Sequence, residues 1–455
     1  MSQPVAPAGA FSLLTHIHGD REMAEVVSGA NTVATWVKVE VALARAQARS
    51  GLFDATIADE IETQVGNVVL DIPRLWKETR VVGYPILTLL NQLIEGMTEE
   101  AAGKLHYGAT TQDIMDTALA LQLVRAGNLM VSRLDVLGNQ LVKRINLDRY
   151  QVIAGRTHAQ QATPTTLGAK WAVFLAEFTR HRGRLIRAFS DTANISLFGA
   201  AGTSAAMGVR SAQVRRYLAE ELNLHYVAVP WHVARDSLAA LALTLANVSA
   251  STVRMAREVV DLSRTEIGEL SESRESLRGA SSTMPQKANP IVSEAIIGLG
   301  VLATSSASAV LRFVEAGHER AAGEWQVEWG VLPEVLLNTS SALLLASEVL
   351  DELVVYPDRI SQNLQADGGA LMSESLMMCL ADRIGRNHAH EIVYEAVRRS
   401  RTDAGEFVDH VRRILAVEYP GLDFTLNVDD PHSYLGETDE ICKTAMDEWI
   451  IARDG

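Results

Sequence analysis

Residues 280–290 have the sequence Ala-Ser-Ser-Thr-Met-Pro-Gln-Lys-Ala-Asn-Pro. Small, hydroxyl, cationic and amide side chains are gathered in this one segment, and its two prolines prevent a regular helix from continuing through it. Long stretches with the composition of helices precede and follow it. The segment therefore predicts a mobile loop between helices, and its polar side chains make it a candidate catalytic loop.

The composition predicts an all-α protein. Hydrophobic residues make up 47% of the chain and aromatic residues only 5%, so that Ala, Leu, Val and Ile carry the apolar content. This balance favours closely packed helices over a β-sandwich. No proline lies between Pro85 and Pro164, between Pro164 and Pro230, or between Pro230 and Pro285. Uninterrupted helices of about ten turns are therefore possible in these three intervals.

Apolar residues after Asp113 recur at the spacing of one buried helical stripe. The members of this stripe are Leu123, Met130, Leu134, Leu137, Leu141 and Ile145. A second helix is expected to start at Asp236, which is a plausible N-cap, and to continue to Leu262. A third is expected directly after Pro290. These three helices would form a central bundle.

A chain of 455 residues is longer than one hydrophobic core usually supports. Pro333 and Pro357 are expected to interrupt the chain after the central bundle. We predict three parts: an N-terminal helical cap (1–110), a central long-helix bundle that carries the catalytic loop 279–290 (111–357), and a C-terminal helical domain (358–455).

The formal net charge of −15 indicates which partners the chain can bind. Nucleic-acid binding requires clustered basic residues that neutralise phosphates, and the sequence contains no run of Lys and Arg that would supply them. We therefore expect no nucleic-acid partner. An anionic small molecule would need a local cationic pocket.

Cysteine usage and hydropathy bear on the compartment. Cys379 and Cys442 cannot form a disulfide framework, and neither lies in a C-x-x-C pair, so we expect a reducing compartment and no structural metal. We also expect no cofactor. The first twenty residues lack a basic segment followed by an apolar core, and no run of about 18 uncharged apolar residues occurs. We expect a cytoplasmic protein without a signal peptide or a membrane-spanning helix.

The segment 280–290 resembles the G-S-S-x-M-P-x-K-x-N-P signature of the fumarase/aspartase superfamily. Ala280 stands where the signature has Gly, and the other fixed positions match. Members of this superfamily eliminate a group from the carbon beta to a carboxylate. The resemblance covers nearly the whole chain and implies a three-domain all-α fold whose central long-helix bundle assembles in a homotetramer. It also implies that each active site is shared between subunits.

Such an elimination removes a weakly acidic carbon-bound proton, so it needs a base, donors that stabilise the enolate-like carboxylate, and an acid for the leaving group. A serine hydroxyl becomes a base only when a closed loop stabilises its alkoxide. The resemblance assigns this role to Ser281, the first serine of the signature. It implies that Ser282 is a loop donor, and that Lys287 and Asn289 bind and polarise the substrate carboxylate.

Residues 108–113 have the sequence Gly-Ala-Thr-Thr-Gln-Asp, which places Thr110, Thr111 and Gln112 at the mouth of a predicted helix. Free backbone N–H groups and the helix dipole attract a carboxylate there, so these three residues are candidate substrate ligands. The same pattern is a common N-capping arrangement, and that structural interpretation stays open.

His158 lies in the polar, helix-breaking segment 155–166, and a histidine can donate a proton near neutral pH. A lone histidine is more often a structural hydrogen-bond donor. The T-H-x-Q pattern that starts at Thr157 resembles the second conserved segment of the superfamily, in which the threonine binds carboxylate and the histidine serves as, or orients, the acid. The resemblance therefore makes His158 catalytic and Thr157 a substrate ligand.

Arg320 is the candidate for a second carboxylate, because a guanidinium can bind a carboxylate with two parallel hydrogen bonds. The aromatic and acidic stretch that follows it, 324–329, is expected to serve helix packing, with Trp325 and Trp329 in the core.

Within the superfamily, the run 108–117, the segment Pro230-Trp231-His232 and the segment 318–329 look most like those of bacterial 3-carboxy-cis,cis-muconate cycloisomerases. Adenylosuccinate lyases usually carry a histidine where this chain has residues 80–85, which contain none, so that activity is disfavoured. His158 stands where some cycloisomerases have Trp, and a histidine suits protonation of a departing amine.

Two enzymatic hypotheses follow. The first is cycloisomerisation of a carboxylated muconate, a small polycarboxylate, and the alternative is a C–N or other C–X lyase that releases fumarate from a substituted succinate. A non-catalytic structural paralogue is a third, distant hypothesis. It is disfavoured because such a protein has no need to retain Ser281, Lys287, Asn289, His158 and Thr157 together.

Overall fold

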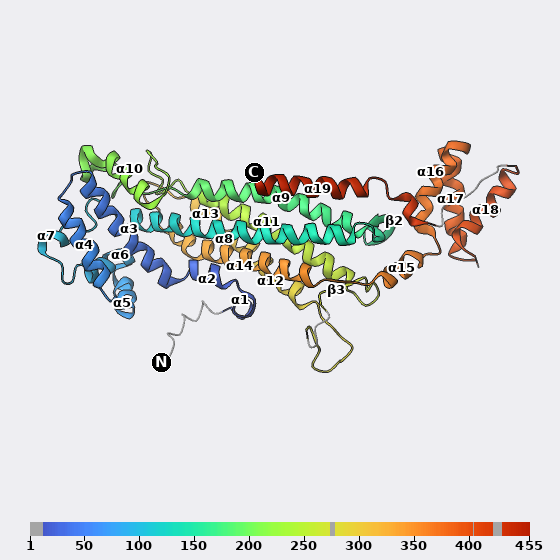
Figure 1. Cartoon of the computed structure of the whole chain (residues 1–455), viewed down its shortest axis with the longest axis horizontal. Coiled ribbons are helices and arrows are strands. Elements are labelled where there is room, and N and C mark those ends of the chain that lie inside the picture. The colour runs from blue at the N-terminus through green and yellow to red at the C-terminus, as the bar shows by residue number, and fades with distance from the viewer. Residues whose placement is uncertain (1–11, 274–277, 404, 422–429) are drawn as a thin grey trace. The chain divides into compact units, whose positions relative to one another are not determined.

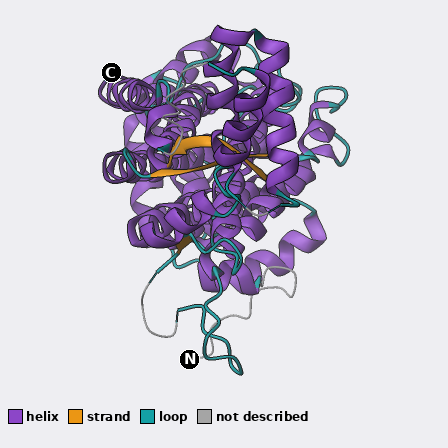
Figure 2. Cartoon of the chain, turned by 90° about the vertical axis from the view of Figure 1, so that its right-hand side faces the viewer, coloured by secondary structure: helices purple, strands orange, loops and turns teal. Residues whose placement is uncertain are grey.

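The computed structural model describes residues 12–273, 278–403, 405–421 and 430–455. Helices dominate this part of the chain, and its strands form two short antiparallel pairs (Figure 2). The all-α prediction is confirmed. The chain forms two compact units: one comprises 1–133, 181–250 and 298–344, and the other comprises 134–180, 251–297 and 345–455. Below they are called unit 1 and unit 2.

In the described part of the chain, five long helices contribute residues to both units (Figure 1). They are α8 (Thr111–Asp148), α9 (Leu167–Thr192), α11 (Asp236–Leu262), α12 (Ile291–Ala307) and α14 (Glu324–Glu352). The predicted stripe on α8 is confirmed, because each of its members, from Leu123 to Ile145, has a side chain that is at most 1% exposed. The helices predicted to start at Asp236 and after Pro290 are α11 and α12.

Unit 1 also contains shorter helices (Figure 1), and most of them contribute residues to one hydrophobic core. They are α1 (Leu13–His18), α2 (Arg21–Val26), α3 (Gly29–Arg49), α4 (Ala55–Asn67), α5 (Ile72–Val82), α6 (Pro85–Leu93), α7 (Glu99–Ala102), the 3₁₀-helix η1 (Ala205–Arg210), α10 (Ser211–Leu222) and α13 (Val310–Val314). Trp36, Ile61 and Leu89 lie in its core, as do residues from the first turns of α8.

Unit 2 contains a hairpin, a small helical bundle and the C-terminal helix. Its further elements are β1 (Val152–Thr157), β2 (Gln160–Thr166), β3 (Leu270–Ser271), β4 (Val354–Val355), α15 (Pro357–Gln365), η2 (Ala370–Met372), α16 (Ser373–Ile384), α17 (Arg386–Ser400), α18 (Phe407–Glu418), η3 (Pro431–Tyr434) and α19 (Thr438–Asp454). Helices α16, α17 and α18 pack around Leu376, Leu380 and Phe407.

Pro333 and Pro357, the two prolines expected to interrupt the chain, lie at different places in the helices. Pro357 is the first residue of α15, as expected of a helix start. The expectation for Pro333 was wrong, because this residue lies inside α14. Proline has no N–H to donate, so the carbonyl four residues earlier, that of Trp329, loses its helical partner. Burial of the surrounding apolar face, including Leu332 and Val335, outweighs this local cost.

Three helical segments are long and apolar enough, by length and composition, to cross a membrane: 236–262, 291–314 and 324–352. In the most apolar stretch of 18 residues in each segment, 61%, 39% and 67%, respectively, is already buried by the rest of the chain. The expectation that the chain has no membrane partner stays a prediction.

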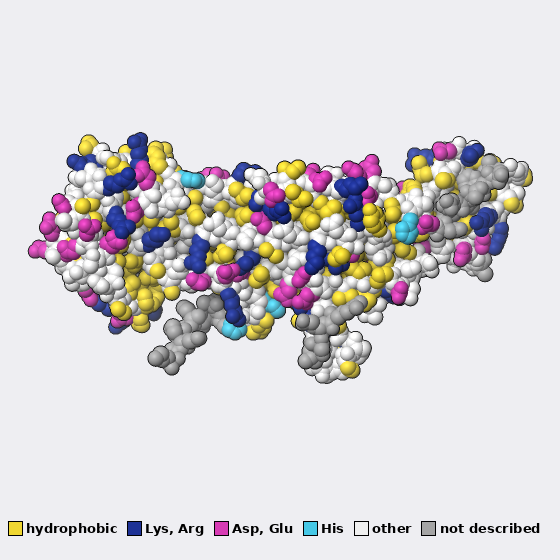
Figure 3. Space-filling view, in the orientation of Figure 1, with side chains coloured by type: hydrophobic (Ala, Val, Ile, Leu, Met, Phe, Trp, Pro, Cys, Tyr) yellow, Lys and Arg dark blue, Asp and Glu magenta, His cyan; other side chains and the backbone are white. Residues whose placement is uncertain are grey.

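On the face shown in Figure 3, Lys and Arg side chains lie among Asp and Glu side chains. The division into 1–110, 111–357 and 358–455 also stays a prediction.

Close packing of α19 on α8 yields a testable prediction about stability. A Cβ added to Gly138 would lie 2.0 Å from the ring of Trp449, which is fully buried. We expect Gly138→Ala to lower the free energy of unfolding by about 1–3 kcal/mol, because the ring cannot move aside in a packed core. Gly66→Ala in α4 is the control: nothing lies within 4 Å of its added Cβ. It should raise stability by about 0.5–1 kcal/mol. Urea denaturation followed by circular dichroism measures both, and equal midpoints would contradict the packing.

Candidate active site

The carboxylate of Asp113, the third residue of α8, is fully buried and holds two separate turns of unit 1. Its Oδ2 accepts hydrogen bonds from the backbone N–H groups of Thr110, at 3.0 Å, and Gly199, at 2.8 Å. Its Oδ1 accepts one from the N–H of Phe198 at 2.9 Å. These bonds fix the turn before α8 against residues 198–199, because a buried charge is stable only when it is fully hydrogen-bonded.

Two side chains complete this network. The Nε2 of His232 lies 2.8 Å from Asp113 Oδ1, and the hydroxyl of Ser196 donates to the same oxygen at 3.3 Å. Gln112 donates from Nε2 to the carbonyl of His232 at 2.8 Å. Among the described residues, Gln112 Oε1 and His232 Nδ1 are buried without a hydrogen-bond partner. Gln112 therefore anchors the 232 segment, and its assignment as a substrate ligand stays a prediction.

Thr110 and Thr111 are partly exposed at the N-terminus of the 38-residue helix α8. The bond from the Thr110 N–H to the side chain of Asp113 is the backward half of a capping box. The N-capping interpretation thus describes part of the geometry. Since the helix dipole still favours an anion at this end, both threonines remain candidate carboxylate ligands.

Arg320 is bound to the same turn that Asp113 holds. Its Nη2 donates to the carbonyl of Ala200 at 3.1 Å, next to Gly199. Its Nε is buried and has no partner among the described residues. Unit 1 therefore brings together Thr110 and Arg320, two of the predicted ligands, through residues 198–200. A guanidinium with an unused N–H beside a helix N-terminus can bind a carboxylate.

Arg235 forms a buried ion-pair network that the sequence alone did not assign. Its guanidinium donates to both oxygens of Asp116, at 2.8 and 3.0 Å, and to both oxygens of Glu328, at 2.7 and 2.5 Å. All three side chains are at most 2% exposed. Burial raises the pKa of Asp116 and that of Glu328, even though Arg235 acts in the opposite direction. The network joins α8, the segment directly before α11, and α14 within unit 1.

His158 lies at the exposed tip of the β1–β2 hairpin in unit 2, beside Thr157. The turn residues His158 and Ala159 have φ of +50° and +62°, values that suit Gly or Asn at a two-residue hairpin turn better than these residues. Next to this tip, the guanidinium of Arg156, which pairs across the hairpin with Gln161, donates to both oxygens of the buried Glu269, at 2.9 and 2.6 Å. The sequence indicated a break in the helix here but not this strained tip.

The loop 279–290 is closed at its base by Gly279 and Asn289. Both the backbone N–H and the side-chain amide of Asn289 donate to the carbonyl of Gly279, at 2.8 and 3.0 Å. Gly279 has φ of +66°, and a Cβ there would lie 2.1 Å from the carbonyl oxygen of Asn289. The amide of Asn289 thus closes the loop here, and its role in binding carboxylate stays a prediction.

Within this loop, the hydroxyl oxygen of Ser281 accepts hydrogen bonds from the backbone N–H groups of Thr283, at 3.3 Å, and Met284, at 3.1 Å. Hydrogen bonds to the anionic form lower the free energy of an alkoxide, which is the requirement for a serine base. Ser282 and Lys287 are exposed on the same loop. The hairpin tip and the loop thus belong to unit 2, and the turn with Arg320 belongs to unit 1.

No cluster of metal-ligating side chains occurs among the residues that the structure describes. The groups at these segments are a candidate base, a candidate proton donor, hydrogen-bond donors and cations. Such a set can move a proton next to a carboxylate and stabilise the charge that develops.

Comparison with known proteins identifies similar chains. A family model described as lyase matches residues 13–303. The chain is 36% identical to 3-carboxy-cis,cis-muconate cycloisomerase of Pseudomonas aeruginosa over 94% of each protein. It is 31% identical to N-acetyl-S-(2-succino)cysteine lyase of Dickeya dadantii, over 98% of this chain and 97% of the other.

A solved structure shares the fold. The crystal structure of fumarate lyase from Mesorhizobium sp. BNC1 superposes with a TM-score of 0.88 at 35% sequence identity. The match covers 94% of this chain and 98% of the other. At this similarity the predicted superfamily fold is confirmed.

The pair of His106 and Glu40 yields a prediction about pH. His106, in the turn that leads to Thr110, lies 2.7 Å through Nδ1 from the buried carboxylate of Glu40. Burial lowers the pKa of His106, but the hydrogen bond and charge of Glu40 outweigh this, and the net pKa is raised. The pair therefore stabilises the fold below the ordinary histidine pKa, and this stability is lost as pH rises through the raised value.

We expect the free energy of unfolding, measured in urea from pH 6 to pH 9, to fall across this interval in the wild-type protein. Glu40→Gln should flatten the profile, because it removes the partner that raises the pKa. Glu391→Gln, beside the exposed His388, is the control and should keep the wild-type profile. A Glu40→Gln profile that still falls as in the wild type would show that another group is responsible.

Proposed function

Because this chain belongs to the lyase family of the fumarase/aspartase superfamily, we propose that it catalyses elimination and addition beta to a carboxylate on a small polycarboxylate, most like a 3-carboxy-cis,cis-muconate cycloisomerase. The observation that carries the proposal is the pair of N–H donors on the hydroxyl oxygen of Ser281. It provides the anion stabilisation that a serine base requires.

In the proposed reaction, Ser281 takes the proton from the carbon alpha to one carboxylate. Electrons from the broken C–H bond move into that carboxylate, whose growing charge Lys287 and the loop donors stabilise. These electrons then form the C–C double bond. In the cyclic form of the substrate, a lactone, the C–O bond breaks at the same time, and the ring oxygen leaves as part of a carboxylate. The reverse direction forms the C–O bond and returns the proton.

The second carboxylate is assigned to Arg320 and to the α8 N-terminus at Thr110 and Thr111. Arg320 is already oriented by the Ala200 carbonyl and retains a buried N–H without a partner among the described residues. Thr157 is assigned to a substrate carboxylate from the hairpin side. Because these groups bind both the substrate and the transition state, they contribute chiefly to affinity and orientation.

The second candidate is a C–X lyase that releases fumarate from a substituted succinate. One observation favours it: His158 is exposed at the hairpin tip, where it can protonate a departing amine or thiolate. The similarity to N-acetyl-S-(2-succino)cysteine lyase agrees with this alternative. Both candidates use Ser281 in the same role, and they differ in the leaving group.

We also propose that the chain is a cytoplasmic homotetramer in which several subunits share each site, and that it acts without metal or cofactor. The support is the superfamily resemblance, in which the loop, the hairpin and the α8 turn of one site come from different subunits. Light scattering of the purified protein tests the tetramer. Turnover that survives treatment with a chelator tests metal independence.

The experiment that tests the proposed function is an ultraviolet assay of the chelator-treated protein with a panel of substrates. The panel contains 3-carboxy-cis,cis-muconate, N-acetyl-S-(2-succino)cysteine and adenylosuccinate, and fumarate release is scored separately from muconate loss. Muconate loss alone supports the cycloisomerase. Fumarate release selects the lyase, and silence on every substrate contradicts both candidates.

Ser281→Ala should lower the turnover number by about a thousandfold, because it removes the proposed general base. Ser308→Ala is the matched control, since that exposed hydroxyl donates to a backbone carbonyl in a helix end. Circular dichroism and light scattering should show the same fold and assembly for both variants. Turnover at the wild-type rate in folded Ser281→Ala would show that another group is the base.

Arg320→Met should raise the Michaelis constant at least about tenfold and change the turnover number less, because a charged hydrogen bond is worth about 1.5–3 kcal/mol in both the bound and transition states. Arg312→Met removes an exposed arginine of α13 that pairs with Glu315, and should change neither constant. An unchanged Michaelis constant in Arg320→Met would reject the assignment.

A further inference from the structure

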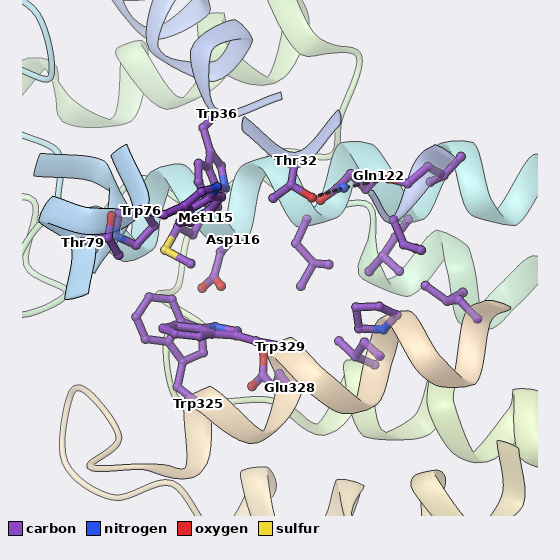
Figure 4. Close-up of a pocket in the computed structure, with 18 of the residues that line it drawn as sticks. Thr32, Trp36, Trp76, Thr79, Met115, Asp116, Gln122, Trp325, Glu328 and Trp329 are labelled. Atoms are coloured by element: carbon purple, nitrogen blue, oxygen red, sulfur yellow. Dashed lines mark hydrogen bonds between the residues drawn. The ribbon is translucent and has the colours of Figure 1, made fainter. Parts of the chain in front are cut away.

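A cavity of about 300 Å³ lies within unit 1, where α3, α5, α8 and α14 contribute its lining (Figure 4). It is lined by four tryptophans, several aliphatic side chains and two carboxylates. The residues assigned to the reaction above do not line it. A volume of this size, mostly apolar and with few polar groups, suits a small organic ligand.

Two aromatic pairs form opposite parts of the lining. Trp36 and Trp76 meet edge to face, with ring centres 6.4 Å apart, and Trp325 and Trp329 do the same at 5.1 Å. Figure 4 shows the first pair above the cavity and the second below it. The expectation that Trp329 belongs to the core was wrong: Trp329 is 40% exposed and Trp76 is 43% exposed, whereas Trp325 is buried.

Large aromatic surfaces are normally covered in a folded chain, so two half-exposed tryptophans at one cavity need a reason. Tyr84 orients one of the two pairs: it stacks on Trp325 with ring centres 5.7 Å apart and meets the edge of Trp329 at 6.2 Å. The indole surfaces of Trp325 and Trp329 are thus positioned before any ligand arrives, which reduces the entropy lost on binding.

The charge at the cavity is negative. Asp116 and Glu328 both line it, and both are bound by the single guanidinium of Arg235, so two carboxylates face one cation. None of the described residues that line the cavity is Lys, Arg or His. His232 is paired with a carboxylate of its own, that of Asp113, and does not line the cavity. An unbalanced buried negative charge favours a cation in the adjoining space.

We propose that this cavity binds an organic cation, specifically a quaternary or other alkylated ammonium group, between the two tryptophan pairs. The negative faces of indole rings attract such a cation, and its methyl groups fill the apolar lining. Asp116 and Glu328 supply the long-range attraction. This ligand is opposite in charge to the polycarboxylate substrate proposed above, and the inference does not depend on that proposal.

Intrinsic tryptophan fluorescence of the full-length protein tests this site, with choline as the probe. The matched neutral probe is 3,3-dimethyl-1-butanol, in which a carbon replaces the quaternary nitrogen. We expect a saturable fluorescence change with choline and binding at least tenfold weaker with the alcohol. Equal affinity for the two probes would overturn the cation assignment, and no change with either would overturn the site.

Two variants locate the binding. Trp329→Leu and Trp76→Leu should each weaken choline binding at least tenfold in isothermal titration calorimetry, because each removes one aromatic surface. Both side chains are partly exposed, so the fold should tolerate the change, and circular dichroism checks it. Tyr394→Leu removes an exposed aromatic ring elsewhere, 66% exposed on α17, and should leave binding unchanged. Wild-type affinity in both tryptophan variants would refute the location.

Discussion

The buried carboxylate of Asp113 accepts hydrogen bonds from three backbone N–H groups, one hydroxyl and one imidazole. These donors belong to the turn before α8 and to two segments much later in the chain, around residues 198 and 232. Once the charge is desolvated, each lost donor is costly, so the three segments are held in one arrangement. The position of Arg320 follows from this, because its partner Ala200 continues the turn that Asp113 fixes.

The first turns of α8 also set the charges on the two sides of unit 1. The helix N-terminus at Thr111 favours an anion, and Asp116, one turn later, faces the tryptophan-lined cavity together with Glu328. Arg235 binds both of these carboxylates, so that two acidic groups at the cavity share one guanidinium. A single helix terminus can therefore serve an anionic substrate and a cationic ligand without mixing the two sites.

Local signals in the sequence predicted the helices and the loop. The spacing of Leu134, Leu137 and Leu141 required a buried helical face, and the order of residues in 280–290 identified the loop. Contacts between distant residues could not be predicted: Arg235 is separated by 119 residues from Asp116 and by 93 from Glu328. The strained hairpin tip was also missed, because His158 and Ala159 carry no glycine or asparagine signal for a left-handed turn. Such exceptions to local preference are expected at functional positions.

The most direct test of this account is the turnover of 3-carboxy-cis,cis-muconate by Asp113→Asn beside the wild-type protein. Asparagine has the shape of aspartate, but its NH₂ group is a donor and must replace one of the two carboxylate oxygens. At the Oδ2 position it would face the N–H groups of Thr110 and Gly199, and at the Oδ1 position it would face the N–H of Phe198. The account predicts that wild-type protein consumes the substrate, and that Asp113→Asn loses at least about a hundredfold in kcat/KM, the result of misplacing binding groups by about 1 Å. A folded Asp113→Asn protein with wild-type kcat/KM would contradict it.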